Sequence, residues 1–361
     1  MHDHLSIPCL LMRGGTSKGP YFKASDLPTD IAARDRVLLA VMGSPDARQI
    51  DGLGGTDTLT SKVAIVSASD REGVDVDYLF AQVDISRPIV DTGPSCGNML
   101  SGVGPFAIET GMVRAQDGVT SVSIFDVNTQ SRIEAVVQTP GGVVNYTGDA
   151  AIDGVPGTAA PIILNFMDAV GAKTGKMLPS GHAMEQINGI DVSCLDVAMP
   201  MVLMRAEDLG LTGIETRAEI DNNKALLTRI EAIRIEAGRR MGFGDVSDSV
   251  MPKVGLLSKP RGTGAITSRY LTPHKLHAAH AVTGAVCVAT AVLLEGSVAY
   301  DLATRPGGNT CTIWIEHPSG MVDVRMETSG AGPTLQVFKA GILRTARPIM
   351  QGNVFVPNGK L

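Results

Sequence analysis

The sequence predicts a two-lobed α+β protein, and three observations support this fold class. The chain has 361 residues, which corresponds to two domains at about 100–200 residues per domain. Apolar residues make up 44% of the chain and charged residues only 19%, so it can form large cores and is not generally disordered. Finally, short strand patterns alternate with a few helical patterns, and several of these segments recur in the second half.

The internal repeat predicts the domain organisation. Four segments of the first half have weakly similar counterparts in the second half, in the same order and at an offset close to half of the chain. The paired segments begin at Pro8 and Ser193, Lys23 and Arg205, Ser61 and Pro252, and Cys96 and Ala281. Chance similarity among strands rich in Ala, Val and Gly is the alternative. The common order favours two similar lobes, 1–184 and 185–361, around a pseudo-twofold axis, with the last strand free to return to the first lobe.

The elements expected in the first lobe begin with a strand, Ile7–Arg13. It ends at the Gly-rich turn GGTSKG, after which we expect a second strand. Pro28–Met42 has a helical pattern, with Thr29 or Asp30 as its N-cap and Gly43 as its stop. The remaining strands are Lys62–Ser67, Val74–Phe80, Val122–Val127 and Arg132–Val137, the last two joined as a hairpin around Asn128–Thr129.

The second lobe contains two clear helical patterns. Asn222–Met241 carries apolar residues at helical spacing and predicts a long amphipathic helix. Ala281–Leu294 is the most apolar segment of the chain, is too short to span a bilayer, and therefore predicts a buried helix. Cys311–Glu316 and Met321–Met326 are expected to form a hairpin around the residues HPSG.

Composition and charge restrict the partners that we expect. The net charge is −6, Lys and Arg form no run, and aromatic residues make up only 4%, which argues against nucleic-acid binding. Five cysteines without a CxxC spacing indicate a reducing compartment, and the first residues lack the pattern of a secretory signal. We therefore expect a cytoplasmic protein with no nucleic-acid partner and no membrane partner. The sequence leaves a homodimer open.

The segment Asp91–Asn98, DTGPSCGN, is the strongest candidate for a chemical site. Its Gly and Pro residues oppose regular structure, and an apolar helical pattern begins at about Met99. Cys96 is therefore expected on a turn at the N-terminus of a buried helix. Free backbone N–H groups there form an anion site and favour a thiolate. A buried cysteine with a purely structural role is the alternative.

The second lobe has a matching helix start. Ala281 is the counterpart of Cys96, and the helix that begins at Thr283 and Gly284 is expected to direct a second set of N–H groups at the same cleft. Two helix starts at one cleft suit a substrate with two or three carboxylates. A chain of negative net charge needs such local positive features to hold a polyanion.

These motifs resemble a known superfamily. CGN at one helix start and TGA at another, half a chain apart, resemble the diaminopimelate epimerase fold, whose members carry a cysteine at both places. Ala281 stands at the second place here, so a two-thiol epimerase or racemase is not expected. Longer motifs resemble the PrpF branch of that superfamily over nearly the whole chain. They are Met12–Gly19, Ile50–Val66, Asp91–Ala107, Gly154–Ile162 and Thr283–Ala291.

The resemblance implies both a fold and an activity. Each lobe is expected to be a curved, mostly antiparallel sheet around a central helix. The implied activity is cofactor-independent isomerisation of an unsaturated polycarboxylate: most closely tautomerisation of 4-oxalomesaconate, with methylaconitate or methylitaconate as alternative substrates. The implied acid/base pair is Lys62 and Cys96, and a proton shift does need a base and an acid around one carbon. Lys62 by itself also fits a solvated strand-edge residue, and a non-catalytic carboxylate-binding accessory protein is the alternative from another functional class.

Further candidates for substrate binding surround these two residues. They are Thr16 and Ser17 in the GGTSKG turn, the backbone of Gly97, Asn98 and Met99, and His280, Thr283 and Gly284 in the second lobe. Ordinary turn hydrogen bonding is the alternative for Thr16 and Ser17. Additional carboxylate partners are Arg13, Lys18 and the backbone of Gly54, Gly55 and Thr56.

Two groups of residues in the second lobe are not assigned to catalysis. Lys253, the repeat partner of Lys62, is expected to be structural, because one pocket needs one such base. His274, His277 and His280 are spaced by three residues, but no acidic residue stands near them in sequence. A metal site is therefore not expected, and the resemblance implies that no cofactor is needed.

Overall fold

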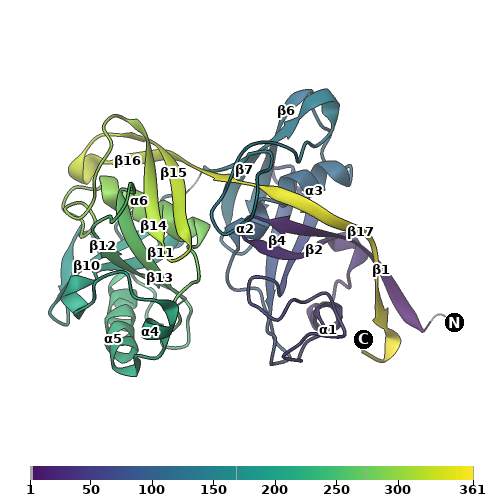
Figure 1. Cartoon of the computed structure of the whole chain (residues 1–361), viewed down its shortest axis with the longest axis horizontal. Coiled ribbons are helices and arrows are strands. Elements are labelled where there is room, and N and C mark those ends of the chain that lie inside the picture. Colours follow the sequence, from purple (N-terminus) through teal and green to yellow (C-terminus); the bar gives the residue numbers. More distant parts are fainter. Residues whose placement is uncertain (1–2, 168, 273, 361) are drawn as a thin grey trace. The chain divides into compact units, whose positions relative to one another are not determined.

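The computed structural model describes residues 3–167, 169–272 and 274–360, and the chain divides into two compact units (Figure 1). The first unit is Met1–Leu164 together with Leu343–Leu361, and the second is Asn165–Ile342. The chain thus enters the second unit earlier than the sequence boundary at residues 184 and 185. The first unit is built from two separate stretches of sequence, because the last strand runs back beside the first one (Figure 1).

The strands of each unit pair in the same order. The first unit contains β1 (His4–Gly14), β2 (Ser17–Lys23), β3 (Lys62–Ala68), β4 (Val76–Val83), β5 (Val90–Asp91), β6 (Gly118–Asp126), β7 (Ser131–Thr139) and β17 (Ala346–Pro357). The second contains β9 (Glu185–Ile187), β10 (Ile190–Val197), β11 (Met199–Arg205), β12 (Lys253–Ser258), β13 (Ile266–Leu271), β14 (Thr310–His317) and β15 (Gly320–Ser329). The crossings between units fall within β8 (Ile162–Phe166) and β16 (Gln336–Arg344).

The order of strand directions in the first unit recurs in the second. Along β1–β2–β3–β4–β6–β7 the pairings are antiparallel, parallel, antiparallel, parallel and antiparallel. The series β10–β11–β12–β13–β14–β15 repeats this sequence of directions. Even the flanking strand is repeated, since β17 pairs antiparallel with β1 as β9 does with β10. The predicted class, α+β with mostly antiparallel sheets, is correct.

One long helix covers one face of the sheet in each unit. In the first unit this is α1 (Ile31–Met42), which begins at the predicted cap Asp30, whose side chain accepts a hydrogen bond from the Ala33 N–H at 2.8 Å. It ends at Gly43, which has a left-handed φ of 73°. Val37, Leu38 and Val41 of α1 join the core formed with β1 to β4. In the second unit the short α4 (Arg217–Asp221) leads into α5 (Lys224–Arg240), which packs into the corresponding core.

The predicted central helix is present in the second unit. It is α6 (Val282–Leu293), whose residues Val282–Val292 are all buried and which packs against β10, β11, β13, β14 and β15. The helix is apolar on every face, as expected for a helix that is surrounded by protein. Among the described residues, none of the helices combines the length and hydropathy that crossing a membrane requires.

The helix expected from about Met99 differs from the prediction. It is divided into α2 (Gly97–Leu100) and α3 (Val103–Glu109). Pro105 accounts for the break, because it has no N–H to donate to the carbonyl of Ser101 and its ring would clash there. The Ser101 hydroxyl instead donates to the Asn98 carbonyl at 2.7 Å and closes α2. Both short helices pack on the face of the sheet opposite α1, against β1, β2, β3, β6 and β7.

Candidate active site

Three buried side chains of the first unit converge: Lys62, Cys96 and Ser17. The Lys62 Nζ lies 3.3 Å from the Cys96 Sγ and donates to the Ser17 Oγ at 3.2 Å. The Ser17 Oγ lies 3.9 Å from the Cys96 Sγ. Lys62 is 7% exposed, Cys96 8% and Ser17 1%. The two residues singled out as an acid/base pair therefore touch, and the hydroxyl of the GGTSKG turn contacts both of them.

The glycines of GGTSKG explain how the turn reaches this position. Gly15 has a left-handed φ of 50°, which glycine adopts without strain. Gly19 lies in β2 directly against the start of β3: a Cβ built on it would stand 1.9 Å from the Lys62 carbonyl oxygen. The two strands therefore approach as closely as backbone allows, and Ser17 and Lys62, each the first residue of its strand, come together.

Cys96 occupies the place that its motif predicts. It is the N-cap of α2, with extended φ and ψ of −135° and 99°. The Tyr78 hydroxyl of β4 donates to the Cys96 carbonyl at 3.2 Å, and the neighbouring Ser95 hydroxyl donates to the Asp126 carboxylate. Hydrogen bonds from β4 and β6 therefore hold the backbone next to the thiol in place.

The surroundings of the pair are apolar and aromatic. The Lys62 Nζ lies 5.7 Å from the centre of the Phe80 ring, within the range of a cation–π contact. Burial, followed by the nearby Cys96, raises the pKa of Tyr21 and that of Tyr78 well above 10.0. Both phenols therefore stay protonated near neutral pH, and they serve the site as hydrogen-bond donors.

Polar groups suited to a carboxylate lie next to the thiol. Gly97, Asn98 and Met99 form the first turn of α2, where N–H groups have no acceptor within the helix. The Asn98 Oδ1 accepts from the Thr16 N–H at 3.4 Å. Within the described residues, the buried Thr16 Oγ1 has no hydrogen-bond partner. The predicted binding residues of the first lobe are therefore grouped around Cys96.

Two of the additional carboxylate partners are already engaged within the protein. The Gly54 N–H donates to the Met42 carbonyl at 3.2 Å and the Thr56 N–H to the Gln49 Oε1 at 2.9 Å, so these two N–H groups of the expected Gly54–Thr56 nest are already used within the protein. The Arg13 guanidinium donates to the carbonyls of Gly15 and Thr345, both at 2.9 Å. Its role in the structure is to tie the turn to the returning chain.

The remaining predicted residues belong to the second unit. Thr283 and Gly284 form the first turn of α6, and a Cβ on Gly284 would meet the Tyr270 ring at 2.4 Å, so this glycine is needed for packing. The buried His280 has Nε2 3.0 Å from the Ser268 Oγ and Nδ1 3.0 Å from the Ala281 carbonyl. Lys253 is buried at the start of β12.

The three histidines have separate contacts. His274 is a surface residue, 62% exposed, with its Nδ1 3.8 Å from the Glu231 carboxylate. The His277 Nδ1 accepts from the Ala279 N–H at 3.0 Å. In the part of the chain that the structure describes, no group of three or more His, Cys, Asp or Glu side chains could hold a metal ion.

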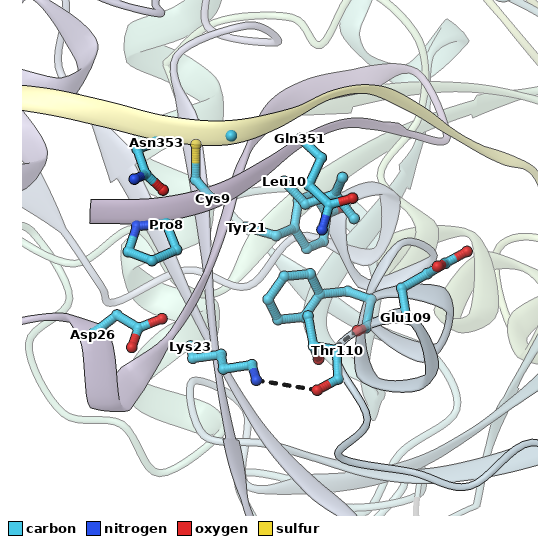
Figure 2. Close-up of a pocket in the computed structure, with 12 residues that line it drawn as sticks. Pro8, Cys9, Leu10, Tyr21, Lys23, Asp26, Glu109, Thr110, Gln351 and Asn353 are labelled. Atoms are coloured by element: carbon cyan, nitrogen blue, oxygen red, sulfur yellow. Dashed lines mark hydrogen bonds between the residues drawn. The ribbon is translucent and has the colours of Figure 1, made fainter. Parts of the chain in front are cut away.

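A separate hollow of about 210 Å³ lies between β1, β17 and α3 (Figure 2). Tyr21 and Phe106 line it, and the Lys23 ammonium is engaged with the Thr110 carbonyl at 3.0 Å. Asp26 and Glu109 stand at opposite sides of it (Figure 2). The hollow has two carboxylates, and its one amine is already hydrogen-bonded, so it is unsuitable for a substrate with several carboxylates. In this respect it differs from the site of Lys62 and Cys96.

The sequence did not point to Tyr78, Asp126 and Asn128 as parts of the site. Tyr78 belongs to the predicted strand Val74–Phe80, and Asp126 and Asn128 have the composition of an ordinary hairpin turn. They reach the Cys96 loop because β4 pairs parallel with β6, which brings the turn after Asp126 beside that loop. No local sequence pattern encodes such a pairing.

Known proteins are similar to this chain over nearly its whole length. A family model described as PrpF protein matches residues 4–357. A (4E)-oxalomesaconate Delta-isomerase of Novosphingobium sp. (strain KA1) is 53% identical over 97% of this chain and 98% of its own. A 4-oxalomesaconate tautomerase of Pseudomonas putida is 52% identical over 97% and 96%. The crystal structure of a methylitaconate-delta-isomerase, 38% identical, covers 99% of this chain and 97% of its own with a TM-score of 0.84.

Proposed function

Because the chain belongs to the PrpF family, and is an isomerase as its relatives are, we propose that its reaction is the keto–enol tautomerisation of 4-oxalomesaconate. Among the relatives that are more than half identical to it, two are named for oxalomesaconate. The observation that carries the proposal is the 3.3 Å separation of the Lys62 Nζ and the Cys96 Sγ. An amine and a thiol in contact form a proton donor and a proton acceptor at one point.

The proposed reaction moves one proton within the substrate. One member of the pair removes a proton from the carbon next to the ketone, and the electron pair passes into the enolate. The other member delivers a proton to the enolate oxygen or to the distal carbon, so the composition of the substrate does not change. Lys62 and Cys96 stand close enough to serve neighbouring atoms of one bound molecule, and Ser17 holds the amine in place.

The neighbouring polar groups account for a substrate with several carboxylates. In the proposal, the N–H groups at Gly97–Met99 and the hydroxyl of Thr16 bind carboxylate oxygens and stabilise the enolate charge. Fixed dipoles of this kind supply positive potential without adding charge to an acidic chain. His280, Thr283 and Gly284 stay predictions as further carboxylate ligands, to be tested by His280→Ala and Thr283→Val.

Proton exchange tests the function directly. In D₂O the purified protein should incorporate deuterium into 4-oxalomesaconate and change its ultraviolet absorbance. Lys62→Met and Cys96→Ser should each lower this rate by about a thousandfold, as expected for loss of a general acid or base. Lys253→Met is the matched control, because Lys253 is equally buried at the equivalent position of the second unit. This variant should turn over the substrate at the wild-type rate.

The same assay decides between the alternatives. Methylitaconate is the second candidate substrate, because a methylitaconate-delta-isomerase has a closely similar structure. Methylaconitate is tested beside it. Fast conversion of one of these two, with slow conversion of oxalomesaconate, would replace the proposed substrate and keep the reaction class. Binding of all three without deuterium exchange would contradict catalysis and favour a carboxylate-binding accessory protein.

A further inference from the structure

The loop that leads into Cys96 is held by a hairpin turn distant in sequence. The Ser95 hydroxyl donates to the Asp126 Oδ2, and the Asn128 Nδ2 donates to the Thr92 carbonyl at 2.7 Å. Asn128 also binds β4 on both sides of its amide: its Nδ2 donates to the Phe80 carbonyl at 2.9 Å, and its Oδ1 accepts from the Phe80 N–H at 2.8 Å. The turn after β6 therefore fastens residues 92–95 onto β4.

These hydrogen bonds restrain a loop that has few buried side chains of its own. Residues 92–95 are exposed or half-buried, and Gly93 and Pro94 offer little side chain for packing. Cys96 itself makes no capping hydrogen bond to the N–H groups of α2. The Asp126 carboxylate, by contrast, is 2% exposed and fixed from both sides, because its Oδ1 accepts the N–H groups of Asn128 at 2.9 Å and Thr129 at 3.2 Å.

We propose that Asp126 and Asn128 are positioning residues for the reaction: they hold the Cys96 loop so that the thiol stays beside the Lys62 amine. The proposal rests on the proposed function, in which these two groups are the acid and the base. Ser95 and Thr92 transmit the restraint, the first through its hydroxyl and the second through its carbonyl. A displacement of about 1 Å at a reacting group costs up to about a hundredfold in rate.

The second unit contains a similar hydrogen bond between a hydroxyl and a buried carboxylate. It belongs to a different compact unit from the one that contains Lys62 and Cys96. Asp196 is fully buried, and its Oδ2 accepts the Thr174 hydroxyl at 2.9 Å and the N–H groups of Lys173 at 2.8 Å and Thr174 at 2.7 Å. Loss of the hydroxyl in Thr174→Ala removes the same kind of hydrogen bond as Ser95→Ala. It therefore controls for a purely structural loss.

The position of the thiol relative to the amine can be measured without catalysis. o-Phthalaldehyde condenses with a primary amine and a thiol that lie in contact, losing two molecules of water and giving a fluorescent isoindole. In the full-length protein the Lys62–Cys96 product is identified by peptide mapping and by its loss in Lys62→Arg. We expect Ser95→Ala and Asn128→Ala to form it at least about tenfold more slowly, and to lower kcat about a hundredfold with little change in KM.

The controls make the outcome decisive. Thr174→Ala should form the isoindole and turn over substrate as the wild type does, and Ser95→Thr, which keeps the hydroxyl, should restore both rates. Isoindole formation at the wild-type rate in Ser95→Ala and Asn128→Ala would overturn the proposal. If these variants lose the isoindole while the wild type converts none of the three substrates, the positioning stands and the proposed function fails.

Discussion

At the scale of single residues, the site depends on the buried amine of Lys62 and on Gly19, which allows β2 to lie close to β3. A lysine is seldom buried, because removing its charge from water costs several kcal/mol unless polar partners replace the water. Lys62 has the Ser17 hydroxyl and the Cys96 thiol as such partners. The Ser17 hydroxyl is one of them because β2 lies directly against the first residue of β3.

Gly19→Ala should therefore damage stability and activity together. The added Cβ would stand 1.9 Å from the Lys62 carbonyl oxygen, a backbone atom that cannot rotate away. We expect the free energy of unfolding to fall by about 1–3 kcal/mol, the usual cost of overpacking, in urea denaturation. Activity should fall further than the remaining folded fraction explains, because β3 carries Lys62.

Gly352→Ala is the matched control for this substitution. Gly352 is also a strand glycine of the first unit, but a Cβ there would meet nothing within 4 Å. Its free energy of unfolding should stay within about 0.5 kcal/mol of the wild type, as for most surface substitutions. Equal losses in the two variants would show that the close approach of β2 and β3 is not the cause.

At the scale of elements, the success of the sequence predictions follows the range of the interactions. The ends of α1 were predictable because Asp30 and Gly43 act on their own backbone. The division between α2 and α3 does not follow from the apolar pattern, which runs through both helices; its local signal is Pro105, which lacks an N–H. The contacts of Asp126 and Asn128 with the Cys96 loop depend on strand pairing across the sheet, which no local pattern encodes.

A carboxylate in the second unit shows how one side chain fixes a connection between elements. Glu316 of β14 accepts the N–H groups of Arg261, Gly262 and Gly264 at 2.7 to 3.1 Å, and the Thr267 hydroxyl at 2.7 Å. Burial alone would raise the pKa of Glu316, but these hydrogen bonds favour the charged form and lower the pKa below its ordinary value of 4.5. The charged carboxylate thus stabilises the loop between β12 and β13.

The pH dependence of stability follows from this direction. A carboxyl group whose pKa is lower in the folded state binds its proton first in the unfolded state, so its contribution is complete above pH 4.5 and disappears as the pH falls through the lowered value. Glu316→Gln should cost about 1–3 kcal/mol at neutral pH and flatten the loss of stability in acid. Glu72→Gln, at an exposed position, should change neither property in the same titration of urea unfolding.

At the scale of the whole molecule, the repeat was predictable but the discontinuous first unit was only left open. The paired segments indicated two similar lobes, and each unit does repeat the same order of strand directions. The sequence does not show which strand the last strand pairs with. The pairing of β17 with β1 is made by backbone hydrogen bonds, which most types of side chain allow. The register of that pair extends from His4 with Pro357 to Gly14 with Ala346.

This return predicts which parts of the chain fold alone. The second unit, 165–342, is continuous and should unfold cooperatively as an isolated fragment. The fragment 1–164 should not, because it lacks the strand that pairs along all of β1, the buried Val356, and the Thr345 carbonyl that accepts the Gly15 N–H at 2.9 Å. An unpaired β1 would also expose a long edge.

A permuted first unit should recover the fold. The Asn358 N–H donates to the Asp3 carbonyl at 3.0 Å, so the end of β17 lies beside the start of β1 and a short turn can join them. The chain 343–361 followed by 3–164 should therefore show one cooperative thermal transition by circular dichroism, and should form the isoindole between Lys62 and Cys96. Cooperative unfolding of 1–164 without the added strand would contradict the argument, since β17 would then be dispensable for the unit that carries both reacting groups.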